Sequence, residues 1–201
     1  MSYEKKIEKD LIEKTPLPER LDIPMLKYFW LSSPLSTRRK EAIPYFLRHI
    51  HVLNNFSENE LRLLSKFFHQ RAFSKDEIIF SEGDSGLGFY FILSGHVEIM
   101  VKEPHSEDFT SLGHLERFDY FGELALLEEN SNRSASAMAK DNSILLGIFK
   151  PDLEELIDYY PTVAAKLLQS ISIIVANRLS LITNEMKILK EKLKRTENES
   201  N

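Results

Sequence analysis

The chain has 201 residues, 42% of them hydrophobic, which is enough for one globular domain with an additional segment. Its net charge of −5 argues against nucleic-acid binding, for which a basic surface is expected. Zero cysteines exclude disulfides and thiolate metal sites, which fits a reducing compartment. Because no apolar run approaches the roughly 18 residues of a membrane span and the N-terminus lacks a signal-peptide core, we expect a cytoplasmic protein without membrane or DNA partners.

The N-terminal part is rich in proline. Five of the eight prolines lie in the first fifty residues, at positions 16, 18, 24, 34 and 44. They break this part into short predicted helices at about 3–14, 19–30 and 36–52. We assign residues 1–54 to an N-terminal helical extension, whose role the sequence does not identify.

Residues 55–160 are predicted to form an antiparallel β-barrel, or jelly roll, with flanking helices, which gives an α+β fold class. Ser57 and Glu60 form a capping box that opens a helix over 61–68. All seven glycines fall between positions 83 and 147, where tight turns are needed. Short β-branched and aromatic runs lie in and beside that span, at 77–80, 89–93, 96–101 and 143–149. Such short, closely spaced strands are typical of a barrel.

One stretch of this domain combines an acid, an arginine and a backbone turn that suit a single ligand. Gly122 leaves room for a ligand at the backbone, and the amides of Glu123, Leu124 and Ala125 would open a short helix that attracts an anion. Arg133 offers a planar fork for a phosphate, whereas Glu123 can accept a hydrogen bond from a hydroxyl. A ribose 3′,5′-cyclic phosphate presents both groups. The alternative is an ordinary helix start followed by a solvated arginine.

The C-terminal part is predicted to be helical. A short helix over 151–160 begins with a proline and stops before Pro161, and from there to about 194 no glycine or further proline interrupts a rod of roughly 50 Å. A heptad seam with seven of eight positions apolar follows this helix: Leu168, Ser172, Val175, Leu179, Ile182, Met186, Leu189 and Leu193. A second stripe should pack on the barrel: Leu167, Ile171, Ile174 and Leu181. We expect residues 161–201, the long helix and a polar tail, to form a parallel homodimer through a coiled coil. The alternative is a monomer whose helix folds onto its own barrel.

The stretch Phe121-Gly-Glu-Leu-Ala-Leu-Leu127, followed by Arg133-Ser-Ala135, resembles the phosphate-binding cassette of the cyclic nucleotide-binding domain family. Ile78-Ile-Phe-Ser-Glu-Gly-Asp84 and Phe89-Tyr-Phe-Ile-Leu-Ser-Gly95 are similar to the first strands of that family, in the same order. The loop length before the arginine is most like that of bacterial catabolite activators. One departure is Phe118, which stands where the family often has a glycine. Because a bulky residue is strained at positive φ, we expect a reshaped turn at 116–119.

The resemblance implies a non-enzymatic sensor that binds a cyclic nucleotide, cAMP ahead of cGMP, without a cofactor, metal or catalytic residues. Its signal would pass through movement of the long helix to a separate effector protein. Transcription factors of the family carry a helix-turn-helix module after that helix, and the polar tail at 195–201 cannot form one, so we expect no DNA-reading output. The alternative is a scaffold that keeps the fold for dimerisation or protein docking and binds no ligand. The effector and the direction of the response stay open.

The resemblance also implies roles for individual residues. Glu123 would bind the ribose 2′-hydroxyl, and Arg133 with Ser134 would bind the cyclic phosphate, together with the amides after the glutamate. Alignment along the long helix makes Thr183 and Asn184 the candidates for reading the purine edge, because their side chains can both donate and accept hydrogen bonds. The alternative for this pair is a polar helix surface.

One arginine on the long helix has two possible roles. Arg178 falls between the two apolar stripes. It either reaches the ligand pocket or only extends its charged end into solvent along the helix surface.

Overall fold

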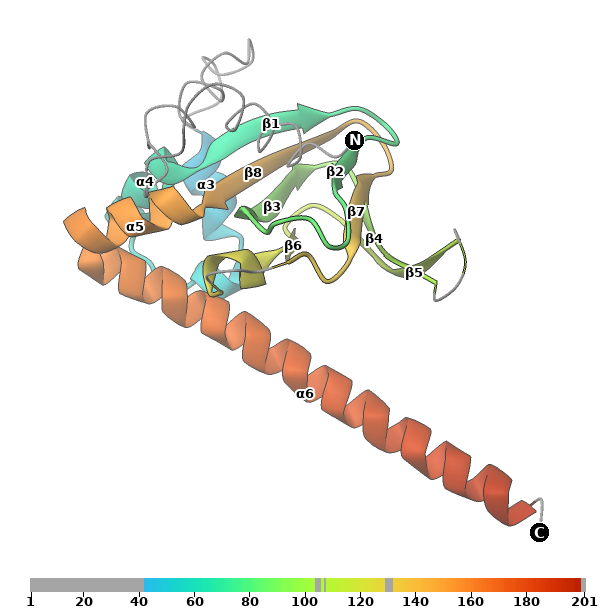
Figure 1. The fold of residues 1–201 in the computed structure, drawn as a ribbon. Coiled ribbons are helices and arrows are strands. Elements are labelled where there is room, and N and C mark those ends of the chain that lie inside the picture. The colour runs from blue at the N-terminus through green and yellow to red at the C-terminus, as the bar shows by residue number, and fades with distance from the viewer. Residues whose placement is uncertain (1–41, 104–105, 107, 129–131, 200–201) are drawn as a thin grey trace, which may run out of the picture.

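The computed structural model describes residues 42–103, 106, 108–128 and 132–199, which fold into two antiparallel four-stranded sheets flanked by helices (Figure 1). One sheet has the strand order β1-β8-β3-β6 and the other β2-β7-β4-β5. The strands are β1 (His69–Phe73), β2 (Ile78–Phe80), β3 (Gly88–Ser94), β4 (Val97–Lys102), β5 (Phe109–Leu115), β6 (Tyr120–Phe121), β7 (Ser136–Ala139) and β8 (Ser143–Phe149). The predicted jelly roll is confirmed. The four predicted strands correspond to β2, β3, β4 and β8, whereas the other four were not predicted.

Helices surround one end of the two sheets. They are α3 (Ala42–Arg48), η1 (His51–Leu53), α4 (Glu58–Leu64), η2 (Ser65–Phe67), η3 (Glu123–Leu126), α5 (Lys150–Tyr159) and α6 (Pro161–Glu199). The predicted capping box at Ser57 is confirmed, because its side chain accepts from the Glu60 amide and the Glu60 carboxylate accepts from the Ser57 amide. The single helix predicted over 36–52 is wrong in its described part, where α3 and η1 are separate elements. The helices predicted at 3–14 and 19–30 lie outside the described residues.

The hydrophobic core formed by the described residues has two parts. One part lies inside the barrel around Tyr90, Val97 and Phe121. The other joins the outer face of the β1-β8-β3-β6 sheet to the helices, and residues 43–53 contribute to it beside Leu167 of α6. A boundary at residue 54 therefore falls inside one continuous core, and the segment from α3 onward is part of the domain rather than an extension of it.

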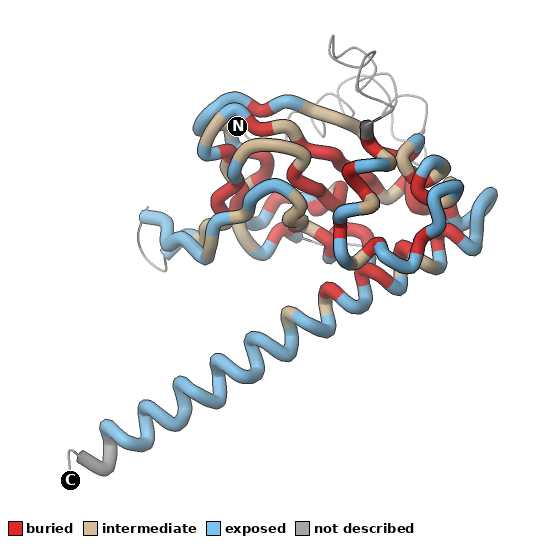
Figure 2. Tube along the Cα trace, turned by 180° about the vertical axis from the view of Figure 1, so that it is seen from behind, coloured by how far each residue is buried: buried red, intermediate tan, exposed pale blue. Residues whose placement is uncertain are grey.

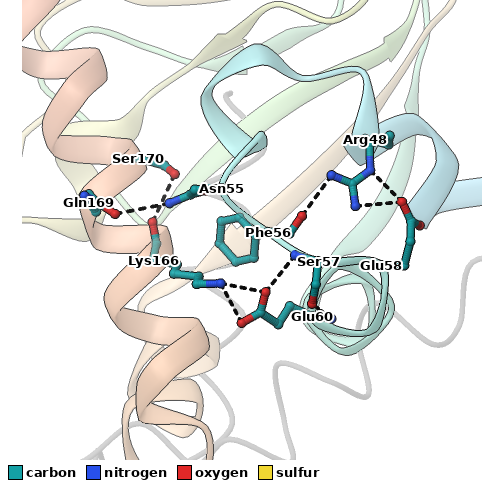
Figure 3. Close-up of polar contacts among 9 residues, drawn as sticks. All are labelled: Arg48, Asn55, Phe56, Ser57, Glu58, Glu60, Lys166, Gln169 and Ser170. Atoms are coloured by element: carbon teal, nitrogen blue, oxygen red, sulfur yellow. Dashed lines mark hydrogen bonds and ion pairs between the residues drawn. The ribbon is translucent and has the colours of Figure 1, made fainter.

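Polar contacts fix the start of α6 against α4 (Figure 3). Lys166 Nζ lies 2.8 and 2.7 Å from the two carboxylate oxygens of Glu60, and the Asn55 amide donates to Gln169 at 3.2 Å. The bond to Lys166 and the capping contacts with Ser57 lower the pKa of Glu60 from 4.5 to about 2. The first turns of α6 are thereby held to α4 and to the segment before it, which sets the direction in which the rest of the helix leaves the domain.

The two halves of α6 differ in burial (Figure 2). Leu167, Ile171 and Ile174 of the predicted inner stripe are buried, as expected, but Leu181 is 63% exposed, so the prediction that it packs on the barrel is wrong. Beyond residue 178 the helix carries a row of exposed apolar side chains: Leu179, Leu181, Ile182, Met186, Ile188, Leu189 and Leu193. The seam predicted from the heptads is therefore available on the surface of a single chain.

The composition of α6 has a second consequence. Among the described residues, one helix, Pro161–Thr196, contains an 18-residue window with a mean hydropathy of 1.3, long and apolar enough by composition alone to cross a membrane, and 22% of that window is buried. The sequence prediction required an unbroken apolar run and so did not register it. Lys166 of this helix forms an ion pair with Glu60 of α4, and Arg178 forms one with Glu123 of η3, so the first half of α6 packs against the rest of the domain.

The turn before β6 has the strained left-handed conformation at Phe118 that we expected this bulky residue to avoid. Phe118 has φ 78°, and the Asp119 amide donates to the Glu116 carbonyl at 2.9 Å, which is the geometry of a type II turn with a bulky residue at its left-handed position. The expected reshaping of 116–119 is wrong. The Phe118 ring stacks on Phe46 of α3, with centroids 5.3 Å apart, and this contact offsets part of the backbone strain.

Candidate functional site

A cavity of about 410 Å³ lies between the barrel and α6, within the range of small-molecule sites. Six of the eight residues predicted to bind the ligand line it: Gly122, Glu123, Leu124, Ala125, Arg133 and Ser134. The remaining lining comes from β2, β4, β5, β6, residues 132 and 135, and one face of α6. The carboxylate and the guanidinium that the sequence places ten residues apart therefore meet at one cavity.

The backbone at Gly122 requires glycine. Its φ is +80°, and a Cβ atom there would lie 2.6 Å from Arg133 Nη1 and 3.1 Å from Gly88 O. The residues that follow form the short helix predicted at this position, a four-residue 3₁₀ helix, η3. The Ala125 amide donates to the Gly122 carbonyl at 3.3 Å, so this amide is engaged within the turn itself.

Arg133 is a buried cation, 5% exposed, and its guanidinium lies 3.9 Å above the Phe80 ring. Nη1 donates to Gly122 O at 3.1 Å and Nη2 to Gly88 O at 2.7 Å. Its main chain pairs with the turn between β2 and β3, where the Arg133 amide donates to Asp84 O at 2.8 Å. These contacts fix the orientation of the guanidinium. Both of these acceptors are neutral carbonyls, whereas an anion that enters the cavity would be a partner with a formal negative charge.

Glu123 is 2% exposed and is held by an arginine from α6. Arg178 Nη1 lies 2.6 and 2.7 Å from the two carboxylate oxygens, and Arg178 Nη2 donates to Tyr120 O at 3.1 Å. Of the two roles considered for Arg178, the structure shows the one in which it reaches the pocket. Burial also raises the pKa of Tyr120, although the Arg178 charge opposes the rise, so the phenol beside this pair is neutral. A ligand hydroxyl at Glu123 must share the carboxylate with Arg178 or displace it.

One face of α6 lines the cavity with four residues at helical spacing: Arg178, Leu181, Ile182 and Glu185. The predicted pair Thr183 and Asn184 does not line it. Both residues are exposed, and the Thr183 hydroxyl donates to the carbonyl of Leu179 at 2.8 Å. This face could have been predicted from the sequence, because residues three, four and seven positions after Arg178 lie on the same side of a helix.

The cavity also contains residues that sequence reasoning did not select. Asn132 lies beside the predicted arginine, and Glu185 stands at the end of the α6 face. Elsewhere in the described part of the chain, no group of three or more histidines and carboxylates is placed to hold a metal ion. The charged and apolar side chains that line the cavity suit a ligand that carries an anion, a hydroxyl and an apolar portion.

Comparison with known proteins supports the same kind of site. Residues 70–160 match the model of the cyclic nucleotide-binding domain family. The chain is 31% identical over 138 residues to the cyclic AMP receptor protein of Thermus thermophilus, covering 69% of this chain and 61% of that protein. It is 33% identical over 104 residues to the cAMP-dependent protein kinase regulatory subunit of Mycosarcoma maydis, covering 52% of this chain and 19% of that subunit.

Solved structures share the fold. The Thermus thermophilus catabolite activator protein matches with a TM-score of 0.60 and 30% identity over 72% of this chain and 63% of that one. A cyclic nucleotide-binding domain from Methylobacillus flagellatus matches with a TM-score of 0.61 at 23% identity, over 70% of this chain and 78% of that one. The chain thus spans less than two thirds of the length of its bacterial relative and about a fifth of the fungal kinase subunit.

Proposed function

Residues 70–160 belong to the cyclic nucleotide-binding domain family, and on that premise we propose that the cavity binds a 3′,5′-cyclic nucleotide. The observation that carries the proposal is the convergence of Glu123 and Arg133 on one cavity, with the left-handed Gly122 backbone between them. The phosphate lies at Arg133 and Ser134, and the ribose 2′-hydroxyl lies at Glu123. The names of the relatives support cAMP as the first ligand to test.

Arg178 connects this ligand to the long helix. Arg178 holds Glu123 and the Tyr120 carbonyl, so a hydroxyl that binds Glu123 weakens the attachment of the middle of α6. A ligand shifts a conformational equilibrium only by the difference in its affinity for the two states. Competition for one carboxylate provides such a difference. We propose that the protein is a cytoplasmic sensor that signals to a separate effector through α6.

The exposed half of α6 supports a homodimer. Exposed Leu179, Met186 and Leu189 continue the predicted seam, and an apolar row of this kind is typical of a coiled-coil partner surface. Leu189→Glu should convert the dimer to a monomer, whereas Lys187→Glu, on an exposed position beside the seam, should leave it intact. Light scattering coupled to size exclusion measures both. A monomeric parent protein would contradict the dimer.

Titration calorimetry with cAMP and cGMP tests the ligand. Arg133→Ala removes the charge partner of the phosphate and should weaken binding by about 2–5 kcal/mol. Because Arg133 is buried and bonded to the main chain, the alanine variant also loosens the fold. Arg133→Lys keeps the charge but loses the planar fork, and should bind more weakly than the parent with less effect on stability. Arg62→Ala, an exposed change on α4, serves as the control.

A second function is favoured by the same contacts. Glu123 and Arg133 both have partners within the chain itself, as a scaffold that binds no nucleotide would require. In that case neither nucleotide gives heat at high micromolar concentration, while the dimer still forms. Binding of either nucleotide that depends on Arg133 and survives Arg62→Ala would dismiss the scaffold.

A further inference from the structure

The face of α6 that lines the cavity changes character along its length. Arg178 begins the face at the ribose end, where it holds Glu123. Leu181 and Ile182 follow, and Glu185 ends the face. Seven residues at 1.5 Å each place Glu185 about 10 Å further along the axis than Arg178, and two full turns keep it on the same side of the helix. This distance is comparable to the reach of a purine attached to the ribose.

Apolar side chains form the walls between these two ends. Leu181 and Ile182 lie on the α6 side, while Leu112 and Leu115 of β5 and Ile99 of β4 lie on the barrel side. Such apolar walls can pack against the flat faces of any base and do not distinguish one base from another. Discrimination between bases therefore falls to a polar group that meets the edge of the ring.

Glu185 is placed to be that group. The residues three and four positions away along the helix are Leu181, Ile182, Ile188 and Leu189, so its own helix offers no cation at contact spacing. Within the described part of the chain the Glu185 carboxylate has no hydrogen-bond or ion-pair partner. A carboxylate accepts hydrogen bonds only, at both oxygens.

We propose that Glu185 reads the edge of the purine and makes guanine the preferred base, so that cGMP binds more tightly than cAMP. Guanine presents two adjacent donors, N1–H and the N2 amino group, which a carboxylate accepts together. Adenine presents one donor, its N6 amino group, beside the acceptor N1, which repels the second carboxylate oxygen. This inference rests on the proposed function and selects among its ligands.

A competing partner for Glu185 exists in the dimer. In a parallel pair of α6 helices, Glu185 and Lys190 flank the apolar seam at the positions that form ion pairs between strands. If Lys190 of a second copy takes the carboxylate, Glu185 contributes to assembly and not to base recognition. The two roles differ in what Glu185→Gln changes.

Titration calorimetry of the intact protein with cGMP and with cAMP separates them. The parent should bind cGMP about tenfold or more tightly than cAMP, the value of one bidentate contact. Glu185→Gln should lose that preference, since an amide can pair with adenine, while Glu191→Gln, the same charge change on an exposed position outside the cavity lining, should keep it.

Two results would overturn the proposal and leave the proposed function standing. One is binding of both nucleotides with a preference that Glu185→Gln does not alter. The other is a parent protein that binds cAMP at least as tightly as cGMP. In the first case, a weaker dimer of Glu185→Gln in light scattering would assign the carboxylate to Lys190. Failure of either nucleotide to bind the parent would instead overturn the proposed function and this inference together.

Discussion

Replacing Arg178 by alanine should destabilise the ligand-free protein more than replacing Glu123, although both changes break the same ion pair. The side chain of Glu123 is 3% exposed and that of Arg178 is 43% exposed. Without Arg178, a carboxylate stays buried and loses its charge partner. Without Glu123, the guanidinium can turn to water.

The magnitudes follow from that asymmetry. Breaking a fully buried pair by removing one partner costs about 3–5 kcal/mol. Because water can enter the space that Arg178 vacates, we expect about 2–3 kcal/mol for Arg178→Ala, including the lost bond to the Tyr120 carbonyl. Glu123→Ala should cost about 1 kcal/mol. The double variant should resemble Glu123→Ala, because Arg178 has little left to stabilise.

Urea unfolding of the ligand-free protein, followed by circular dichroism, measures all four members of this cycle. Arg62→Ala on α4 controls for the loss of a surface arginine and should stay within about 0.5 kcal/mol of the parent. Equal losses for the two single variants would contradict the asymmetry expected from burial, and a double variant whose loss is their sum would show that Glu123 and Arg178 do not stabilise each other.

Three further changes test other parts of the fold. Gly122→Ala should destabilise by about 1–2 kcal/mol and weaken nucleotide binding in calorimetry, because its Cβ would lie 2.6 Å from Arg133 Nη1; unchanged affinity would contradict this. In urea unfolding, Phe118→Gly should be more stable than Phe118→Ala by about 1 kcal/mol, because glycine accepts φ 78° without strain. The reverse order would show that the turn is relaxed. Because the folded pKa of Glu60 is lowered from 4.5 to about 2, its contribution to stability is present above pH 4.5 and is lost as pH falls towards 2. Lys166→Met should reduce the fall in melting temperature as the pH is lowered from 4.5 to 2. A fall as steep as in the parent would assign it to other carboxylates.

Much of the site was predictable because it is local in the chain. Gly122 and Glu123 are adjacent, Arg133 follows within one loop, and all three line the cavity. The strands with β-branched and aromatic runs were equally accessible, since their pattern is the physical cause of their conformation. Strand β5 was not, because most of its residues are exposed and it carries no alternation that distinguishes it from a polar loop.

Contacts between distant segments determined the rest. Phe118 keeps a left-handed backbone while its ring stacks on Phe46, a neighbour 72 positions earlier that no local rule could supply. Likewise Arg178 became part of the site through Glu123, 55 residues away. The amino-acid pattern alone was sufficient for the barrel, the end of the cavity formed by Gly122, Glu123 and Arg133, and the long helix, because each depends on neighbours in the chain. Which face of α6 meets the cavity, and hence that Glu185 rather than Thr183 and Asn184 lines it, depended on how the helix is anchored to the barrel, since a rotation of one residue about its axis presents a different set of side chains.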